Sequence, residues 1–481
     1  MDLAAVIAGI EFVNLTGRPN ARITAVACDS RKVVADTLFF ALPGAKTNGN
    51  EFVADALARG AVAIASAQPA PADLPREITW IELLAGTDRK ALAVAAANFY
   101  GRPADALKLI GVTGTNGKTT ITYIIDSILR AAGYTTGRIG TTGYDTPQGF
   151  RVATNTTPES IDLQQMFAEV RDAGGTHAVL EVSSHSLVMD RTWGCHFDVA
   201  IFTNLTRDHL NFHKTFEEYF AAKKVLFAGT GAGAPGTAVL NIDDPYGARL
   251  DGLAKRTLTY GISSAADLTA KKFALSFHGL EFTAQTPAGP VEVRSALVGR
   301  INVYNILAAI GAALALEIPV VKIEEGIRQL ELVPGRFQRI DEGQPFLVVV
   351  DYAHADDAMR NLISTARELN PSGRIITVFG AGGERDRSTR PPMGEAAGSL
   401  SDLVILTSDN PRSEDPLRII NDVVVGLQKV NANYVIEPDR DLAVTMAIDE
   451  AKPGDIVLLA GKGHENYQIL RDRTYEFDDR E

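Results

Sequence analysis

The fold of this chain is decided by residues 109–120, LIGVTGTNGKTT, in which an apolar run passes through three glycines into a lysine and two threonines. Apolar side chains at helical spacing follow directly: Ile121, Ile124, Ile125, Ile128 and Leu129. Gly133 suits the position just beyond the end of this helix. A strand, a glycine loop and a helix in this order are typical of a nucleotide-phosphate site, where backbone N–H groups and the helix N-terminus bind the anion.

Within this loop, Lys118 adds a positive charge for the phosphates, and a threonine hydroxyl is expected to reach Mg²⁺. The glycine spacing departs from the common phosphate loop. The position five residues before Gly117 is Val112, and the other glycines stand at positions 111 and 114. The strand-loop-helix context nevertheless favours phosphate binding over a chance match.

Length and composition limit the remaining possibilities. A chain of 481 residues is too long for one core and predicts about three domains. With 47 Lys and Arg against 59 Asp and Glu, the net charge of −12 disfavours a surface that coats nucleic acid. Two cysteines, Cys28 and Cys195, exclude a disulfide framework and a thiolate zinc cluster. Asp2 and Glu11 interrupt any signal-like pattern at the start, so we expect a cytoplasmic protein without membrane insertion.

Three α/β segments are predicted along the chain. Short apolar runs alternate with helical stretches over residues 22–100, which indicates a small N-terminal domain spanning 1–104. The strand at 107–112 opens a central P-loop domain, 105–334. Pro334-Gly335 then interrupts a helical pattern, so a third domain is expected over 335–481.

The third domain is expected to be a doubly wound parallel sheet. Four apolar runs, FLVVV, RIITVF, LVILT and DIVLLA, are separated by helical segments. Each run ends in a polar cluster: DYAH, GAGGERD, SDNPRSED and GKGHE. Ligands of such sheets bind beyond the carboxyl ends of the strands, so four clusters at one edge predict a binding site there.

Two strand ends in the central domain also carry polar groups. Glu181 closes the run THAVLE, where a charge is costly without a partner such as a metal ion. Asp208, His209 and His213 follow the run DVAIF. A lone histidine is more often structural, but two such clusters in one P-loop domain favour Mg²⁺ coordination by Glu181 and His209.

Motifs in a fixed order extend along nearly the whole chain: GTNGKTT, Thr156-Thr157-Pro158, EVSSH, DHL, Y-x-x-x-K, GRINVYN, VPGR, DYAH, GERD, DNPR and GKGHE. This set resembles the Mur ligases, and most of all the members that add meso-diaminopimelate in peptidoglycan synthesis. The resemblance implies a UDP-sugar-binding N-terminal domain, a central ATPase domain and a C-terminal Rossmann-like domain that closes over ATP and receives the amino acid. The implied substrates are ATP, UDP-N-acetylmuramoyl-L-alanyl-D-glutamate and meso-diaminopimelate, with Mg²⁺ as the cofactor of a cytoplasmic, monomeric ligase.

The resemblance also assigns roles to individual residues. ATP is assigned to Gly114, Thr115, Asn116, Gly117, Lys118, Thr119, Thr120, Asn305, Arg336, Asp351 and His354. Mg²⁺ is assigned to Thr119, Glu181, His209 and Lys223, the last as a carbamate, and Lys118, Glu181, His209 and Lys223 form the catalytic set. The UDP-muramoyl dipeptide is assigned to Ser30, Thr156, Thr157, Ser183 and Arg191. Diaminopimelate is assigned to Arg385, Asp409, Asn410, Arg412, Gly461 and Glu465.

Some residues depart from the family pattern, and two assignments have an alternative. Asn211 and Lys214 replace the usual Asp and Gly, Ala355-Asp356 replaces Thr-Pro, Glu384 replaces Asp, and Met189 replaces a substrate-contacting Gln. Lys224 competes with Lys223, although the spacing to Leu226-Phe227 favours Lys223. Arg412 is interpreted as the cation that captures the distal carboxylate of diaminopimelate, whereas the alternative is a surface ion pair with Glu414 or Asp415.

Three other functions compete with an amide ligase of this type. Folylpolyglutamate synthesis uses the same phosphate loop and carboxylate chemistry, but the N-terminal DSR and the DNPR segment argue against it. A P-loop kinase or a nucleotide switch leaves the polar clusters of the third domain unexplained. A purely binding role is the weakest of the three.

Overall fold

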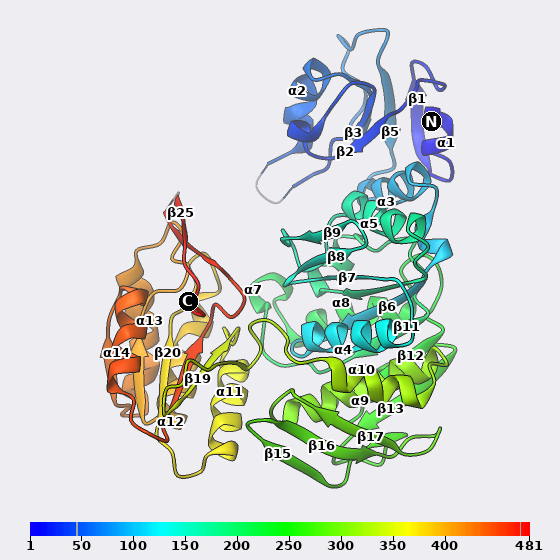
Figure 1. Cartoon of the computed structure of the whole chain (residues 1–481). Coiled ribbons are helices and arrows are strands. Elements are labelled where there is room, and N and C mark those ends of the chain that lie inside the picture. Colours follow the sequence, from blue (N-terminus) through cyan, green and yellow to red (C-terminus); the bar gives the residue numbers. More distant parts are fainter. Residues whose placement is uncertain (45–46, 472) are drawn as a thin grey trace.

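The computed structural model describes residues 1–44, 47–471 and 473–481, which build three α/β bodies along the chain (Figure 1). The N-terminal body lies at the top of the view, the central one below it, and the C-terminal one beside the central one. The three-domain α/β fold predicted from the sequence is thereby confirmed. The boundaries after residues 104 and 334 stay predictions. No described helix has the length and apolar character needed to cross a membrane.

The N-terminal body is a five-stranded sheet in the order β1-β5-β4-β3-β2, in which only β1 runs antiparallel to its neighbour. Its strands are β1 (Phe12–Thr16), β2 (Ala25–Ala27), β3 (Thr37–Phe40), β4 (Ala61–Ser66) and β5 (Thr79–Leu83). Its helices are α1 (Leu3–Val6), α2 (Val53–Ala58), α3 (Asp88–Phe99) and the 3-10 turns η1 (Ser30–Lys32), η2 (Gly49–Phe52) and η3 (Pro103–Ala106). Phe39 and Phe40 face opposite sides of the sheet and join separate apolar clusters, as the alternation of side chains along a strand requires.

The central body contains a nine-stranded sheet in the order β14-β13-β12-β11-β6-β10-β7-β8-β9, parallel as far as β7 and antiparallel beyond it. The strands are β6 (Lys108–Thr113), β7 (Thr136–Gly140), β8 (Gly143–Thr146), β9 (Gly149–Arg151), β10 (His177–Glu181), β11 (Val199–Phe202), β12 (Thr237–Asn241), β13 (Arg256–Gly261) and β14 (Leu268–Thr269). The helices are α4 (Lys118–Ala131), α5 (Ser160–Asp172), α6 (Ser184–Val188), α7 (Leu210–His213), α8 (Phe216–Ala228), η4 (Ala248–Leu250), α9 (Arg300–Ala315) and α10 (Val320–Gln329). An antiparallel sheet that the sequence did not predict adds β15 (Phe273–Ser276), β16 (Gly279–Ala284) and β17 (Val291–Ser295).

The strand-loop-helix unit around the glycine loop is confirmed. Strand β6 is almost wholly buried, and the apolar stripe of α4, from Ile121 to Leu129, packs into the central core. Gly133 follows the helix end at φ +89°, and its N–H donates to the Arg130 carbonyl. A residue in this left-handed conformation commonly ends a helix, because glycine adopts it without steric cost.

The C-terminal body is a six-stranded sheet in the order β18-β19-β23-β20-β21-β22, parallel except at the β18 edge. Its strands are β18 (Gln338–Ile340), β19 (Leu347–Asp351), β20 (Ile375–Phe379), β21 (Leu403–Leu406), β22 (Tyr434–Ile436) and β23 (Ile456–Ala460), followed by the hairpin β24 (Tyr467–Leu470) and β25 (Arg473–Glu476). Its helices are α11 (Asp356–Leu369), η5 (Arg387–Thr389), α12 (Arg390–Leu400), α13 (Pro416–Lys429) and α14 (Arg440–Glu450). The four apolar runs predicted as parallel strands are β19, β20, β21 and β23, which confirms the doubly wound arrangement.

A buried ion pair anchors the end of the chain beneath this sheet edge. Arg440, the first residue of α14, donates from Nε and Nη2 to the two carboxylate oxygens of Asp479 at 2.7 and 2.6 Å, and both side chains are fully buried. The Arg440 guanidinium also donates to the carbonyls of Ser408 and Ala460, at the ends of β21 and β23. The pair therefore ties the C-terminal tail to the two strand ends that precede the DNPR and GKGHE clusters.

We predict that Arg440→Met lowers the stability of the C-terminal domain by about 3–5 kcal/mol, because Asp479 is left as a buried charge without its partner. Lys429→Met is the control, since Lys429 pairs with Glu395 at an exposed site where such a pair contributes about 1 kcal/mol at most. Calorimetric unfolding should show the transition of this domain at a clearly lower temperature for Arg440→Met alone. Equal shifts for the two variants would contradict the role given to the buried pair.

Candidate active site

A cleft lies between the central and C-terminal bodies, at the carboxyl ends of the strands of both sheets. The central body contributes the glycine loop, the end of β10 and the start of α9, and the C-terminal body contributes the segment after β19. Of the residues predicted to bind ATP or Mg²⁺, the cleft is lined by Thr115, Asn116, Gly117, Lys118, Thr119, Thr120, Glu181, His209, Asn305, Arg336, Asp351 and His354. The structure therefore brings together a set of residues that spans about half of the chain.

Two glycines of the loop allow close contacts that a side chain would prevent. Gly114 has φ +143°, and a Cβ atom there would lie 1.7 Å from Oγ1 of Thr203. Gly117 has φ +89°, and its Cβ would lie 2.5 Å from Oδ1 of Asn305 on α9. The unusual position of Gly114 thus follows from packing against the residue after β11, and Gly117 is required by packing against α9.

Two lysines converge on the same backbone carbonyl of this loop. Lys118 Nζ donates to the carbonyl oxygens of Gly114 at 3.0 Å and Thr115 at 2.8 Å, and Lys223 Nζ from α8 donates to the Gly114 oxygen at 2.7 Å. Burial lowers the pKa of both amines, and the neighbouring charge of Lys118 lowers the pKa of Lys223 further. Lys224 points away from this site and is exposed, so helix α8 presents Lys223 to the loop.

The carboxylate of Glu181 is buried at the end of β10 and is held from two sides. Oε1 accepts from Thr119 Oγ1 at 2.9 Å and from the Thr141 N–H at 2.8 Å, and Oε2 accepts from Thr141 Oγ1 at 3.1 Å. Thr141 was missed by the sequence reasoning, although it follows strand β7 in the run IGTTG and so carried the same strand-end signal. Carboxylate and hydroxyl oxygens beside a phosphate loop are donors that suit Mg²⁺, which takes one or two carboxylates and completes its shell with phosphate oxygens and water.

His209 lies at the rim of the cleft, next to Asp208. Its Nε2 is 3.3 Å from the Asp208 carboxylate, and burial lowers its pKa to about 3, which leaves a neutral imidazole. Helix α7 follows, with Asn211 exposed and Lys214 at φ +59°, a backbone conformation that suits the glycine usual in the family better than a lysine. Among the described residues, no group of three or more His, Cys, Asp or Glu side chains lies close enough to hold a metal ion by itself.

The C-terminal body touches the phosphate loop directly. Arg336 Nη2 donates to Thr119 Oγ1 at 3.2 Å, and Asn116 Nδ2 donates to the Asp357 carboxylate at 2.8 Å. Asp351, at the end of β19, accepts from the N–H groups of Phe337 and Ala353, and burial raises the pKa of its carboxyl. These contacts form the wall of the cleft opposite the glycine loop.

Ala355 and Asp356, which depart from the family pattern, do not prevent α11 from starting here. Ala355 occupies the N-cap position without a side-chain bond, and Asp356 and Asp357 supply acidic groups in the first turn, where they favour the positive end of the helix dipole. Asp357 also contacts the phosphate loop, because its carboxylate accepts from Asn116. The Thr-Pro pair of the family is therefore replaced by alanine and aspartate, and the acidic groups of Asp356 and Asp357 stabilise this helix end.

The residues predicted to hold the UDP-muramoyl dipeptide divide between two places. Thr156 and Ser183 line the cleft near Glu181, and Thr157 is buried behind them with its hydroxyl bonded to the Glu181 carbonyl. Arg191 is held by the Thr157 carbonyl at 2.8 Å and by Glu159 at 2.8 Å, with its Nη2 3.8 Å from the sulfur of Met189. Ser30 lies apart from the cleft, buried in turn η1 of the N-terminal body.

Of the residues predicted to hold diaminopimelate, Arg385 lines the cleft. The others follow the ends of β21 and β23. Asn410 Nδ2 donates to the Glu465 carboxylate at 2.8 Å, and a Cβ on Gly461 would lie 2.8 Å from Oδ2 of Asp409. Burial and the nearby Asp409 raise the pKa of Glu465.

Arg412 is held by carbonyl groups. Its Nη1 donates to the oxygens of Gly383 at 2.7 Å and Asn410 at 3.4 Å. Glu414 is bound instead by Arg390, and Asp415 caps α13 by accepting from the Leu417 N–H. Neither acid pairs with Arg412 among the described residues, so the alternative of a surface ion pair is not observed.

The hairpin of β24 and β25, which was not predicted from the sequence, holds the loop that contains Arg412. The N–H of Arg412 donates to the Ile469 carbonyl at 3.1 Å, the N–H of Ile469 donates to Oδ1 of Asn410 at 2.9 Å, and Gln468 Nε2 donates to the Asp409 carbonyl at 2.8 Å. Arg412 itself has φ +55°, a conformation that a non-glycine residue keeps only when its surroundings impose it. Strand β24 supplies that constraint.

Comparison with known proteins places most of the chain in recognised domains. Residues 22–100 match the family described as "Mur ligase family, catalytic domain", residues 112–313 match "Mur ligase middle domain", and residues 335–463 match "Mur ligase, glutamate ligase domain". The matches follow the order of the three bodies described above.

Relatives match over nearly their whole length. A Solibacter usitatus protein named "UDP-N-acetylmuramoyl-L-alanyl-D-glutamate--2,6-diaminopimelate ligase" is 55% identical over 460 residues, 95% of this chain and 92% of its own. A Geobacillus kaustophilus protein of the same name is 45% identical over 98% of this chain and 95% of its own. A solved structure titled as a ligase of that name superposes with a TM-score of 0.68 at 33% identity, over 100% of this chain and 97% of that one. The resemblance found in the sequence motifs is confirmed, and the chain belongs to the Mur ligase family.

Proposed function

We propose that this protein is an ATP-dependent ligase that joins meso-diaminopimelate to the D-glutamate γ-carboxylate of UDP-N-acetylmuramoyl-L-alanyl-D-glutamate, in peptidoglycan precursor synthesis. The names of the similar proteins support the substrates, and the cleft supports the chemistry. The observation that carries the choice of amino acid is the DNPR loop, where the Arg412 guanidinium donates to carbonyl oxygens while Glu414 is bound by Arg390. We also propose that the enzyme is cytoplasmic and monomeric.

The reaction must activate a carboxylate, which is a poor electrophile. An oxygen of the D-glutamate γ-carboxylate attacks the γ-phosphorus of ATP, so that ADP leaves and an acyl phosphate forms. The neutral amine of the incoming amino acid then attacks the acyl carbon, loses a proton and expels phosphate, which leaves an amide bond. Lys118 is placed to offset the negative charge that builds on the phosphoryl oxygens, since its amine lies within the glycine loop.

We propose that Mg²⁺ is held by Thr119, Glu181, His209 and the carbamate of Lys223. When bound, the ion supplies positive charge to the phosphate oxygens. The hydroxyl of Thr119 and the carboxylate of Glu181 already lie 2.9 Å apart beside the loop. Lys223 suits carbamate formation because its pKa lies well below that of an ordinary lysine, so the neutral amine that reacts with CO₂ is favoured.

Folylpolyglutamate synthesis shares the fold and the carboxylate chemistry, and it is the second candidate. The relatives at 45–55% identity carry the diaminopimelate ligase name, and the DNPR loop with its arginine lies beyond the end of β21. Both observations favour diaminopimelate over glutamate.

Lys118→Ala should abolish ligation while leaving the fold intact, because the Lys118 side chain lines the cleft rather than an apolar core. The loss of a charge that acts most strongly in the transition state should cost about 3 kcal/mol or more, on the order of a hundredfold in rate. Rates of ADP release at saturating substrates, with circular dichroism as a check of folding, measure this. A folded variant that turns over at nearly the wild-type rate would contradict the phosphate-loop assignment.

Lys223→Ala should be inactive, and short carboxylic acids added to the assay should partly restore its activity, because they replace the missing carbamate oxygen. Lys224→Ala is the matched control and should stay close to wild type, since Lys224 is exposed on the same helix turn. Activity that no short acid restores would count against the carbamate, as would an inactive Lys224→Ala.

The wild-type enzyme should prefer meso-diaminopimelate to lysine by a hundredfold or more. Lysine lacks the distal carboxylate, so binding lysine would leave the Arg412 guanidinium without an anionic partner, at a cost of roughly 3–5 kcal/mol. In Arg412→Ala this preference should collapse. Specificity constants for both amino acids in both proteins test it, and a variant that keeps its preference would show that another group reads the carboxylate.

A further inference from the structure

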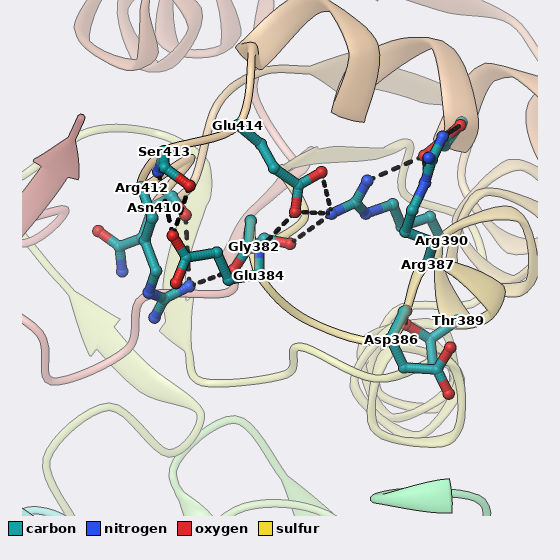
Figure 2. Close-up of polar contacts among 12 residues, drawn as sticks. Gly382, Glu384, Asp386, Arg387, Thr389, Arg390, Asn410, Arg412, Ser413 and Glu414 are labelled. Atoms are coloured by element: carbon teal, nitrogen blue, oxygen red, sulfur yellow. Dashed lines mark hydrogen bonds and ion pairs between the residues drawn. The ribbon is translucent and has the colours of Figure 1, made fainter. Parts of the chain in front are cut away.

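A buried arginine behind the DNPR loop contacts three separate segments of the C-terminal body (Figure 2). Arg390, the first residue of α12, has a side chain that is 1% exposed. Its Nη2 donates to both carboxylate oxygens of Glu414, at 2.9 and 3.0 Å, and to the Gly382 carbonyl at 3.1 Å. Its Nη1 donates to Asp422 of α13 at 2.9 Å.

The loops that Arg390 holds are those that carry the cations proposed to bind the amino acid. Gly382 belongs to the loop after β20 that leads to Arg385, and Glu414 belongs to the loop after β21 that contains Arg412. The two loops also contact each other, because the Gly383 N–H donates to the Asn410 carbonyl at 2.9 Å and Ser413 Oγ donates to Glu384 at 2.6 Å. Arg390 itself is not among the residues that line the cleft.

The acid that Arg390 binds stands two residues from Arg412. Glu414 accepts from Arg390 and from the N–H of Glu384, and the hydrogen bonds from Arg390 lower the pKa of its carboxyl, so it is a carboxylate at neutral pH. A carboxylate so close in the chain would be the natural partner of the Arg412 guanidinium. In the structure Arg390 binds the Glu414 carboxylate, as Figure 2 shows. The Arg412 guanidinium donates instead to the carbonyls of Gly383 and Asn410.

We propose that Arg390 is a positioning residue for amino-acid selection: by binding Glu414 and Gly382 it keeps Arg412 from pairing within its own loop and leaves that guanidinium for the carboxylate of the substrate. The inference rests on the proposed function, in which Arg412 reads the distal carboxylate. Without Arg390, Glu414 loses its cation and pairs with Arg412, which removes the charge that distinguishes diaminopimelate from lysine.

The test compares four purified, full-length proteins: wild type, Arg390→Met, the double variant Arg390→Met/Glu414→Gln, and Arg387→Met. Arg387 is the matched control, since its exposed side chain binds Asp422, as that of Arg390 does, but forms no hydrogen bond or ion pair with Glu414 among the described residues. KM and kcat are measured for meso-diaminopimelate, lysine and ATP, with thermal unfolding recorded for each protein.

Arg390→Met should raise the KM for diaminopimelate at least tenfold and reduce the preference over lysine by a similar factor, while the KM for ATP stays within about twofold. The double variant should recover most of the preference, because the uncharged amide that replaces the Glu414 carboxylate no longer competes for Arg412. Arg387→Met should match wild type. Recovery on neutralising Glu414 is a result that a merely structural role of Arg390 would not give.

A folded Arg390→Met that keeps its preference would overturn the inference, as would a rise in the KM for ATP as large as that for diaminopimelate. A double variant that folds but stays unselective would also overturn it. If Arg390→Met does not fold, Arg390→Lys takes its place: it keeps a cation beside Glu414 and should stay selective, and loss of selectivity there would contradict the proposal. A wild type without preference for diaminopimelate would instead contradict the proposed function itself, which separates the two failures.

Discussion

The carbonyl oxygen of Gly114 is the group around which the two lysines proposed for catalysis are arranged. It accepts hydrogen bonds from the amines of Lys118 and Lys223, which arrive from two different helices. Two buried amines at one oxygen are compatible only when anionic groups balance them or when one amine is neutral, and the lowered pKa of Lys223 reflects this constraint. Nucleotide phosphate at Lys118 and a carbamate at Lys223 would each meet it, so the electrostatics of the loop and the proposed chemistry agree.

The C-terminal body completes this site from the opposite side. Arg336 reaches Thr119, which in turn donates to Glu181, so one hydroxyl joins the wall of the cleft to the carboxylate proposed to hold Mg²⁺. Contacts from both bodies therefore meet at Glu181. The phosphate loop and the loops proposed to bind the amino acid lie near one another because the two domains meet there.

Patterns local in the sequence predicted much of this arrangement. The glycine loop, the strand-end position of Glu181 and the four clusters of the third domain all follow from strand and helix periodicity, and helix phase alone separates buried Lys223 from exposed Lys224. Contacts between distant segments could not be predicted in this way. Arg412 is an example: Glu414 stands two residues away in the sequence, but Arg390 binds that acid, and strand β24 fixes the backbone of Arg412. Neither Arg390 nor β24 can be recognised as a partner of this loop from the residues next to Arg412 in the sequence.

The most direct test of the account is the dependence of ATP turnover on the two other substrates. ADP release should be measured with UDP-N-acetylmuramoyl-L-alanyl-D-glutamate alone, with meso-diaminopimelate alone, with both, and with lysine or glutamate in place of diaminopimelate. The account predicts sustained ADP release, with an equal amount of amide product, only when the UDP-dipeptide and diaminopimelate are both present. Sustained release without an amine, or equal turnover with lysine or glutamate, would contradict it.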